Sequence, residues 1–272
     1  MHEEYWQLET KPFEPIPEPA MCYPHEPQSG ALLKLRYALE NRRDGAMLVG
    51  PSGVGKTLLV RLLREEMPAE FQPMVHLIFP QMSSRDLLVY LADQLGAPTA
   101  ESPRFTIEET VTRLQNCLRE NAAAGRHAVV FVDEAHLLED CGALETLRLL
   151  LNFNDEQPML TLVLLGEPSL LSAVSRFSSL EERLAVKALL RSFTLAETAA
   201  YVKHRLEAAG ATREIFTPQA LEALHYATQG IPRRINRLGD LALLVGFAEG
   251  LPTIDAAQIE SVSGELVTVG AE

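Results

Sequence analysis

Residues 50–57 read GPSGVGKT, which matches the pattern G-x-x-x-x-G-K-[ST] of a phosphate-binding loop. The apolar run AMLV precedes this loop at residues 46–49, and a helical pattern follows it over residues 56–67. A phosphate-binding loop joins a buried strand to the start of a helix, so both flanks agree with the motif. A glycine-rich turn that ends in Lys-Thr by chance is the weaker alternative, because it does not explain this agreement.

The residue types in this loop suit the phosphate groups of a nucleotide. Glycine lets the backbone curve so that successive N–H groups point at phosphate oxygens. Lys56 can reach the terminal phosphates, and the hydroxyl of Thr57 can bind Mg²⁺. We therefore predict that the nucleotide contacts Gly50, Pro51, Ser52, Gly53, Val54, Gly55, Lys56, Thr57 and Leu58.

A second motif, HAVVFVDEAH at residues 127–136, offers the groups that a nucleotide hydrolase needs. Its apolar strand carries Asp133 to the C-terminal end, where the carboxylate can hold the Mg²⁺ shell, and Glu134 is placed to polarise the attacking water. Two solvated acids at a strand end are the alternative, which is weaker beside a phosphate-binding loop. We therefore predict Glu134 as a catalytic residue, Asp133 as nucleotide-binding, and Thr57 with Asp133 as the metal site.

The letters DEAH at residues 133–136 are also similar to a helicase box. A match of this length is weak, and the sequence holds no other helicase motif. His136 either couples the site to a partner or packs, and the sequence leaves both open.

Short apolar runs alternate with amphipathic helical patterns in the first two thirds of the chain. This alternation is typical of a parallel sheet with helices on both faces. After Phe193 only helical periodicity remains, with Thr217 expected as a helix N-cap and Pro218 at the first helical position. The fold class is therefore predicted as α/β, a phosphate-loop sheet flanked by helices, with a small C-terminal helical domain. The expected strands are 46–49, 74–79, 127–133 and 159–165.

The proline-rich stretch KPFEPIPEPAMCYPHEP at residues 11–27 must be extended rather than helical. It leads into a helical pattern at residues 31–39, so we expect an arm that lies along a domain. The predicted division is an arm with its helix at 1–44, an ATPase domain at 45–193, and a helical domain at 194–272.

Composition limits the location and the partners. The chain has 272 residues, 47% of them hydrophobic, and a net charge of -13, which argues against broad nucleic-acid binding because counterion release needs clustered Lys and Arg. The N-terminal MHEEYWQLET lacks the apolar core of a secretory signal, and no apolar run approaches the roughly 20 residues of a membrane span. We expect a soluble protein of the cytoplasm.

A phosphate-loop ATPase with a helical domain after its sheet resembles the AAA+ superfamily. In that superfamily the helical lid carries a sensor-2 arginine, typically within a G-x-P-R stretch, and residues 230–236 read GIPRRIN. The resemblance implies that Arg233 reads the phosphates of ATP, while Arg234 is solvated or in a salt bridge.

The match is closer to the ExeA family, the general secretion pathway protein A ATPases. KPFEPIPEPAMCY is similar to the N-terminal arm of that family, and LVLLGEPSL, LEERL, LAETAAYVKHRLEAAG and GIPRRINRL keep the family's order. The resemblance implies ATP and Mg²⁺ as cofactors, a homo-oligomer, and a protein partner in a membrane-associated assembly. It also implies that Phe13 and Tyr23 pack near the adenine; the alternative is that both fill a surface groove.

One residue departs from the family pattern. GEPSL stands where the family commonly reads G-Q-P-x-L, so Glu167 occupies the position of sensor 1. A carboxylate facing a phosphate about 4 Å away would be repelled by roughly 4 kcal/mol at an effective dielectric of about 20. We expect Glu167 to turn away, to pair with an arginine, or to be protonated.

Arg183 in LEERL lies where AAA+ proteins place the arginine that reaches a neighbouring subunit's ATP, and it is the predicted catalytic residue in trans. A solvated helix face is the plain alternative, and Arg176 is a rival for the same task.

Two other functions compete with an ExeA-like ATPase. A regulator similar to the TniB transposition ATPases would act on DNA, and a basic surface on the lid would favour it. A nucleotide-gated switch with little turnover is disfavoured by the adjacent Asp133 and Glu134. The residues of such a basic surface would be Lys203, Arg205, Arg213, Arg234 and Arg237.

Overall fold

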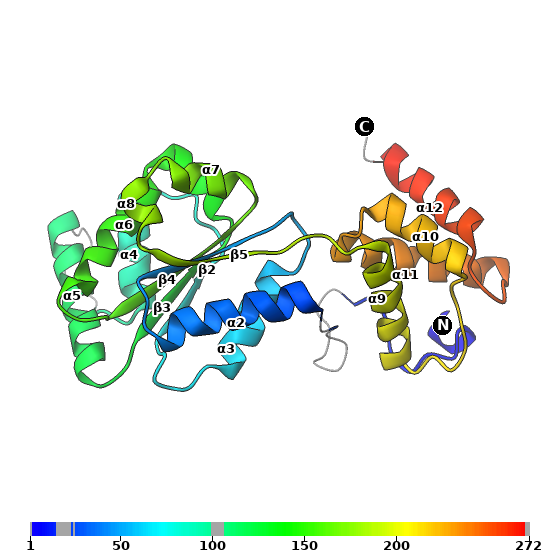
Figure 1. Ribbon diagram of the computed structural model, residues 1–272, viewed down its shortest axis with the longest axis horizontal. Coiled ribbons are helices and arrows are strands. Elements are labelled where there is room, and N and C mark those ends of the chain that lie inside the picture. Colours follow the sequence, from blue (N-terminus) through cyan, green and yellow to red (C-terminus); the bar gives the residue numbers. More distant parts are fainter. Residues whose placement is uncertain (1, 15–22, 24, 99–105, 270–272) are drawn as a thin grey trace. The chain divides into compact units, whose positions relative to one another are not determined.

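The computed structural model describes residues 2–14, 23, 25–98 and 106–269 (Figure 1). The chain forms two compact units. The sheet unit consists of Glu26–Ser52 and Lys56–Leu190, and the helical unit consists of Met1–His25, Gly53–Gly55 and Arg191–Glu272.

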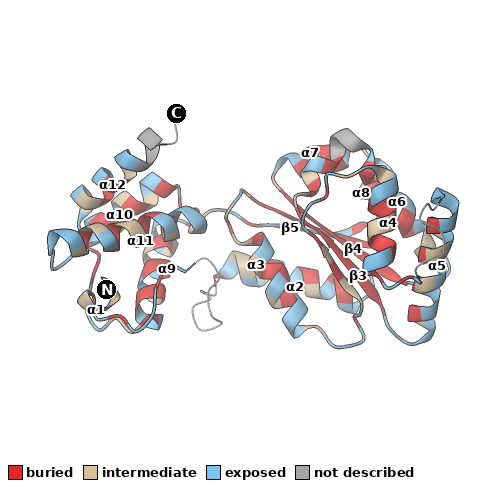
Figure 2. Cartoon of the chain, turned by 180° about the vertical axis from the view of Figure 1, so that it is seen from behind, coloured by how far each residue is buried: buried red, intermediate tan, exposed pale blue. Residues whose placement is uncertain are grey.

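The sheet unit is built on a sheet of parallel strands in the order β2-β3-β4-β1-β5. Every residue of β1, β3 and β4 is buried, and β3 and β4 are red in Figure 2. Central parallel strands need such continuous apolar sequence because helices cover both of their faces. The strands are β1 (Gly45–Val49), β2 (Met74–Leu77), β3 (Ala128–Val132), β4 (Leu160–Gly166) and β5 (Leu184–Leu189).

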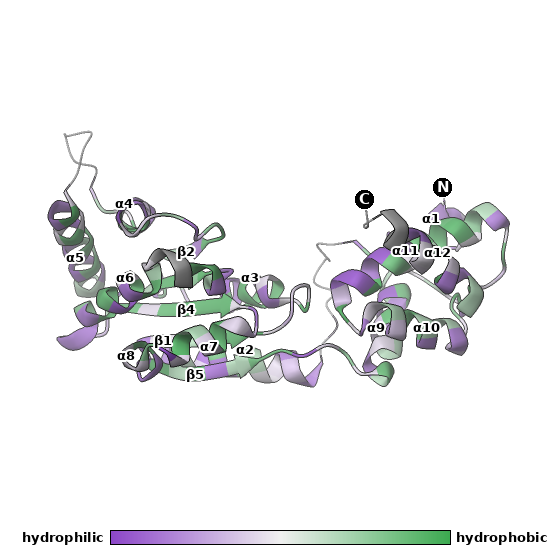
Figure 3. Cartoon of the chain, turned by 90° about the horizontal axis from the view of Figure 1, so that it is seen from above, coloured by the Kyte–Doolittle hydropathy of each residue, from purple (hydrophilic) through white to green (hydrophobic). Residues whose placement is uncertain are grey.

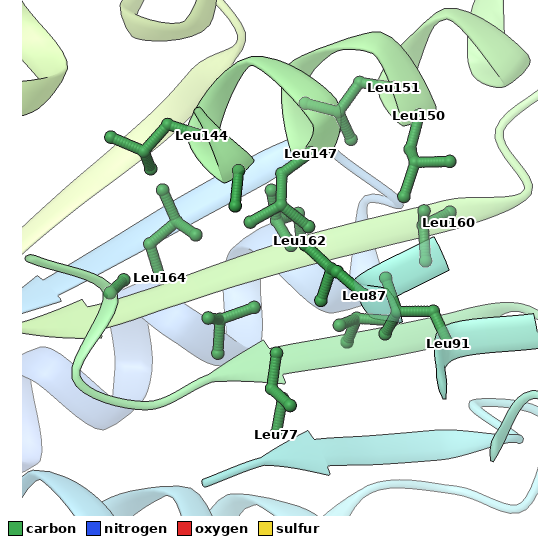
Figure 4. Close-up of a cluster of buried hydrophobic side chains, with 14 of the residues drawn as sticks. Leu77, Leu87, Leu91, Leu144, Leu147, Leu150, Leu151, Leu160, Leu162 and Leu164 are labelled. Atoms are coloured by element: carbon green, nitrogen blue, oxygen red, sulfur yellow. The ribbon is translucent and has the colours of Figure 1, made fainter. Parts of the chain in front are cut away.

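Helices cover both faces of this sheet, as predicted. Figure 1 shows α2 (Glu26–Glu40) and α3 (Lys56–Glu66) on one face, and α6 (Ala143–Leu150) and α7 (Ser169–Ser175) on the other. On the second face, leucines from the helices and from alternate strand positions form one buried cluster (Figure 4). The remaining elements of this unit are α4 (Ser84–Gln94), α5 (Ile107–Ala123), α8 (Ser178–Glu181) and the 3₁₀ segments η2 (Ala135–Cys141) and η3 (Leu151–Asp155).

The strand β5, at one edge of the sheet, was not indicated by the sequence. Its sequence LAVKAL has only partial burial, with Lys187 exposed and paired to Glu181. Figure 3 shows mixed colours along β5 and mainly the hydrophobic colour along β4. An edge strand is less covered than a central one, so it lacks the apolar run by which the other strands were found.

The helical unit contains α9 (Leu195–Ala208), α10 (Pro218–Thr228), α11 (Pro232–Glu249) and α12 (Ala256–Val269), together with the short α1 (His2–Tyr5). The predicted cap of α10 is confirmed, because Thr217 Oγ1 accepts a hydrogen bond from Ala220 N at 3.1 Å and Pro218 begins the helix. Among the residues that the structure describes, no helix is both long and apolar enough to cross a membrane.

The N-terminal segment, residues 2–14, completes the core of the helical unit. Trp6 is buried and donates from Nε1 to the carbonyl of Leu243 at 2.9 Å. Phe13 is also buried and packs edge-on against Phe216. The structure thus groups residues 1–25 with the C-terminal helices and α2 with the sheet, whereas the expected arm ran over 1–44. Residues 15–22 and 24 of that arm lie outside the described residues.

Candidate nucleotide-binding site

The phosphate-binding loop joins β1 to α3, as its sequence predicts. Gly53 and Gly55 have φ values of 83° and 101°, which glycine adopts readily and which let the loop curl. The Lys56 side chain is only 6% exposed, and its ammonium donates to the carbonyls of Gly50 at 2.8 Å and Pro51 at 3.2 Å. The lysine is therefore held against the loop that it is expected to serve.

Thr57 and Asp133, which lie far apart in the sequence, meet in the sheet unit. Thr57 Oγ1 donates to Asp133 Oδ2 at 2.9 Å, and Asp133 is buried, with 4% of its surface exposed. Burial acts to raise the pKa of Asp133, but the nearby His76 ring and the hydrogen bonds from Thr57 and the Glu134 backbone outweigh it and lower the pKa. Asp133 is thus an ionised carboxylate at neutral pH.

This pair fits the predicted Mg²⁺ site. A hydroxyl and a carboxylate are hard oxygen ligands, and Mg²⁺ beside a nucleotide needs only one or two protein ligands plus phosphates and waters. Within the described ranges, no three His, Cys, Asp or Glu residues gather as a metal cluster, so the site is not an all-protein cage.

His76 on β2 is a member of this site that the sequence did not indicate. Its Nε2 lies 3.5 Å from Asp133 Oδ2, because β2 pairs directly with β3. A histidine within the strand-like run MVHLIF was the available signal, but only the strand order brings it to the carboxylate.

Glu134 follows Asp133 and is the N-cap of η2, in a left-handed conformation with φ 50°. Its carboxylate lies 3.5 Å from His136 Nδ1, and it is partly exposed. His136 Nδ1 also accepts a hydrogen bond from the backbone of Glu167 at 3.4 Å, so the end of β4 contacts the segment after β3. The sequence left the role of His136 open, and the structure places it beside the predicted catalytic carboxylate.

Known proteins are similar to this chain in sequence and in fold. The family model described as "AAA domain" matches residues 40–174. General secretion pathway protein A of Aeromonas hydrophila is 36% identical over 254 residues, which cover 92% of this chain and 46% of that protein. Residues 40–174 of this chain belong to the AAA domain family. The chain spans about half the length of this curated relative.

Solved structures share the AAA domain fold at low sequence identity. The ORC2 protein of Aeropyrum pernix matches with a TM-score of 0.69 and 17% identity, over 94% of this chain and 71% of that chain. A chain of Drosophila ORC matches with a TM-score of 0.70 and 17% identity, over 97% of this chain and 66% of that one. The predicted fold class is therefore confirmed.

Arg183 of the sheet unit is held by contacts within its own chain. Its guanidinium donates to Asp44 Oδ2 and Asp155 Oδ1, each at 3.0 Å, and to the carbonyl of Leu151 at 2.9 Å. Arg183 directly precedes β5 and Asp44 directly precedes β1, so both lie at the N-terminal ends of the strands. Asp133, in contrast, follows the C-terminal end of β3. The network gives Arg183 a structural role that the sequence did not indicate, and its action in trans remains a prediction.

The arginines of the helical unit divide into exposed and buried ones. Arg233 is exposed in the first turn of α11, and Arg234 is exposed and donates to Gln229 at 3.3 Å. Arg205, in contrast, is 1% exposed, so it cannot belong to a basic surface. Arg213 donates to a backbone carbonyl and lies over the Trp6 ring.

The two aromatic residues expected near adenine both lie in the helical unit. Phe13 is in its core, and Tyr23 packs against Phe193 and Tyr201 with ring centroids 6.1 Å and 5.9 Å apart. Proximity of either ring to an adenine remains a prediction.

Proposed function

We propose that this chain binds ATP with Mg²⁺, hydrolyses it, and uses the cycle to change the conformation of a partner assembly. The observation that carries the proposal is the hydrogen bond between Thr57 and Asp133. It joins the two sequence motifs that were predicted independently to bind one metal-nucleotide complex. An oligomer and a cytoplasmic location belong to the same proposal.

Each residue of the site has a defined task in this mechanism. Lys56 binds the terminal phosphates, and its present carbonyl partners show how close it lies to the loop backbone. Thr57 and Asp133 would hold Mg²⁺, which neutralises charge on the phosphate oxygens. Glu134 accepts the proton of the attacking water. Arg233, from the helical unit, reads the γ-phosphate.

A protein assembly at a membrane is the partner that we favour. The curated relative carries the name General secretion pathway protein A, and 92% of this chain aligns with it. A DNA partner has less support, because Arg205 is buried and the net charge of the chain is -13.

Substitution of the loop lysine tests nucleotide binding. We expect Lys56→Ala to lose ATP binding, measured by calorimetric titration, because the phosphates lose their cationic ligand. Lys34→Ala removes an exposed lysine of the same unit and serves as the control. Circular dichroism checks that both variants fold. Undiminished ATP affinity in folded Lys56→Ala would reject the assignment of the loop.

A further inference from the structure

A buried arginine connects the N-terminal segment to α9. Arg205 donates from Nε to the carbonyl of Pro12 at 2.5 Å and from Nη2 to the carbonyl of Glu14 at 2.9 Å. A guanidinium keeps its charge in proteins, and a buried charge is costly unless it is hydrogen-bonded. These contacts therefore fix the N-terminal segment on α9 in one register.

Tyr201, one turn before Arg205, extends this connection to α11. Arg205 Nη1 donates to the Tyr201 hydroxyl at 3.2 Å, and that hydroxyl donates to Asn236 Oδ1 at 2.7 Å. A tyrosine hydroxyl has one proton to donate. The Tyr201 hydroxyl accepts from Arg205, so its own proton is directed at Asn236. A cationic donor at the start of such a chain strengthens the later hydrogen bond.

The first turn of α11 lacks a side-chain cap, although Pro232 begins the helix and Arg233 N donates to the carbonyl of Gly53 at 3.2 Å. Its N-cap is Ile231, which gives no side-chain hydrogen bond to the helix. Arg233 and Arg234 follow at once, and positive charge at a helix N-terminus opposes the helix dipole. The contact from Tyr201 to Asn236, one turn after Arg233, is therefore a lateral support for this turn.

We propose that Arg205, Tyr201 and Asn236 are positioning residues that hold the first turn of α11, and with it Arg233, in the orientation that distinguishes ATP from ADP. The N-terminal segment sets this orientation through its two carbonyl contacts with Arg205. The inference rests on the proposed role of Arg233 as the residue that reads the γ-phosphate.

Tyr201→Phe tests the proposal because it removes the hydroxyl and keeps the ring against Phe193. Tyr5→Phe is the matched control, since the Tyr5 hydroxyl donates to the carbonyl of Leu251 at 2.8 Å, just beyond the other end of α11. Affinities for ADP and for a non-hydrolysable ATP analogue are measured by calorimetry. We expect Tyr201→Phe to lose roughly tenfold of the preference for the ATP analogue, the size of a lost charge-assisted hydrogen bond, and Tyr5→Phe to lose none.

Variants of Asn236 separate positioning from general stability. Asn236→Asp keeps an oxygen acceptor for Tyr201 and should retain the preference, whereas Asn236→Ala should lose it. The double variant Tyr201→Phe/Asn236→Ala should lose no more than either single variant, because both break one hydrogen bond. Affinity for ADP should stay unchanged throughout.

The variant Arg233→Ala separates a failure of the proposed role of Arg233 from a failure of the positioning inference. If Arg233→Ala keeps the preference for the ATP analogue, the proposed role of Arg233 is wrong and the positioning inference is wrong with it. If Arg233→Ala loses the preference while Tyr201→Phe keeps it, or loses ADP and ATP affinity equally, only the positioning inference is overturned.

Discussion

Glu134 adopts a backbone conformation that costs a residue with a side chain about 1–3 kcal/mol. Such strain persists where the surrounding structure holds the residue for a purpose, here to present a carboxylate next to Asp133. We predict that Glu134→Gln still binds ATP but releases phosphate about 10²- to 10⁴-fold more slowly, because the attacking water loses its base. Glu182→Gln, at an exposed glutamate, is the control. Unchanged phosphate release would show that Glu134 is not the activating group.

His127 gives the sheet unit a dependence on pH. Burial lowers the pKa of His127 from 6.5 to about 4, while its ring contacts Thr161 and the carbonyl of Pro158. As the pH falls, His127 therefore takes up its proton at a higher pH in the unfolded chain than in the folded one. Stability is fully present above pH 6.5 and is lost as the pH falls towards 4, by up to about 3 kcal/mol. Urea unfolding at several pH values measures this loss, and His127→Gln should flatten the profile.

Single residues differ in how far the sequence alone could place them. The tasks of Lys56, Thr57 and Asp133 follow from short motifs whose flanks define the local geometry. His76 and Arg205 could not be placed, because the partner of one depends on strand order and the partners of the other lie 193 and 191 residues away.

At the scale of elements, aromatic rings of the N-terminal segment pack so closely on α11 that they leave room only for glycine at their contact points. A Cβ at Gly246 would stand 2.8 Å from the Trp6 ring, whereas a Cβ at Gly264 in α12 meets nothing within 4 Å. We predict opposite signs: Gly264→Ala stabilises by up to about 1 kcal/mol through helix propensity, and Gly246→Ala destabilises. Trp6 is the single tryptophan, so its fluorescence during urea unfolding reports on the helical unit. Stabilisation by Gly246→Ala would contradict the packing described for Trp6.

Elements were predictable where burial imposes a strict pattern. The continuous apolar runs of β1, β3 and β4 follow from coverage on both faces, and the cap of α10 follows from Thr217 and Pro218. The strand β5 and the grouping of the N-terminal segment with the C-terminal helices depend on tertiary pairing, which leaves little periodicity in the sequence.

At the scale of the whole molecule, the arginine that acts in trans can be identified by mixing inactive variants. Arg183 is engaged with Asp44 and Asp155, whereas Arg176 lies exposed just after α7, where its Nε donates to the carbonyl of Ser172 at 3.2 Å. We therefore expect Arg176→Ala and Lys56→Ala preparations to recover partial ATP hydrolysis when combined, because a mixed oligomer contains some complete sites. A finger arginine contributes about 10³ to 10⁵ to phosphoryl transfer, so the signal is large.

Arg183→Ala should instead show lowered stability, since the carboxylates of Asp44 and Asp155 lose a partner, and mixing it with Lys56→Ala should add no ATP hydrolysis to that of Arg183→Ala alone. Recovery with Arg183→Ala and none with Arg176→Ala, after subunit exchange is confirmed, would return the trans role to Arg183.

The placement of residues 2–14 in the helical unit also determines the order in which the chain can mature. During synthesis these residues leave the ribosome well before α11, yet Trp6 is hydrogen-bonded to Leu243, 237 positions later. The sheet unit lies between residues 2–14 and α11 in the sequence. It can fold while the apolar side chains of residues 2–14 are still exposed to water. Contacts between residues so far apart in the sequence form slowly. The helical unit is thus completed after the sheet unit, and a nascent chain stalled before α11 would display Trp6 and Phe13 to chaperones.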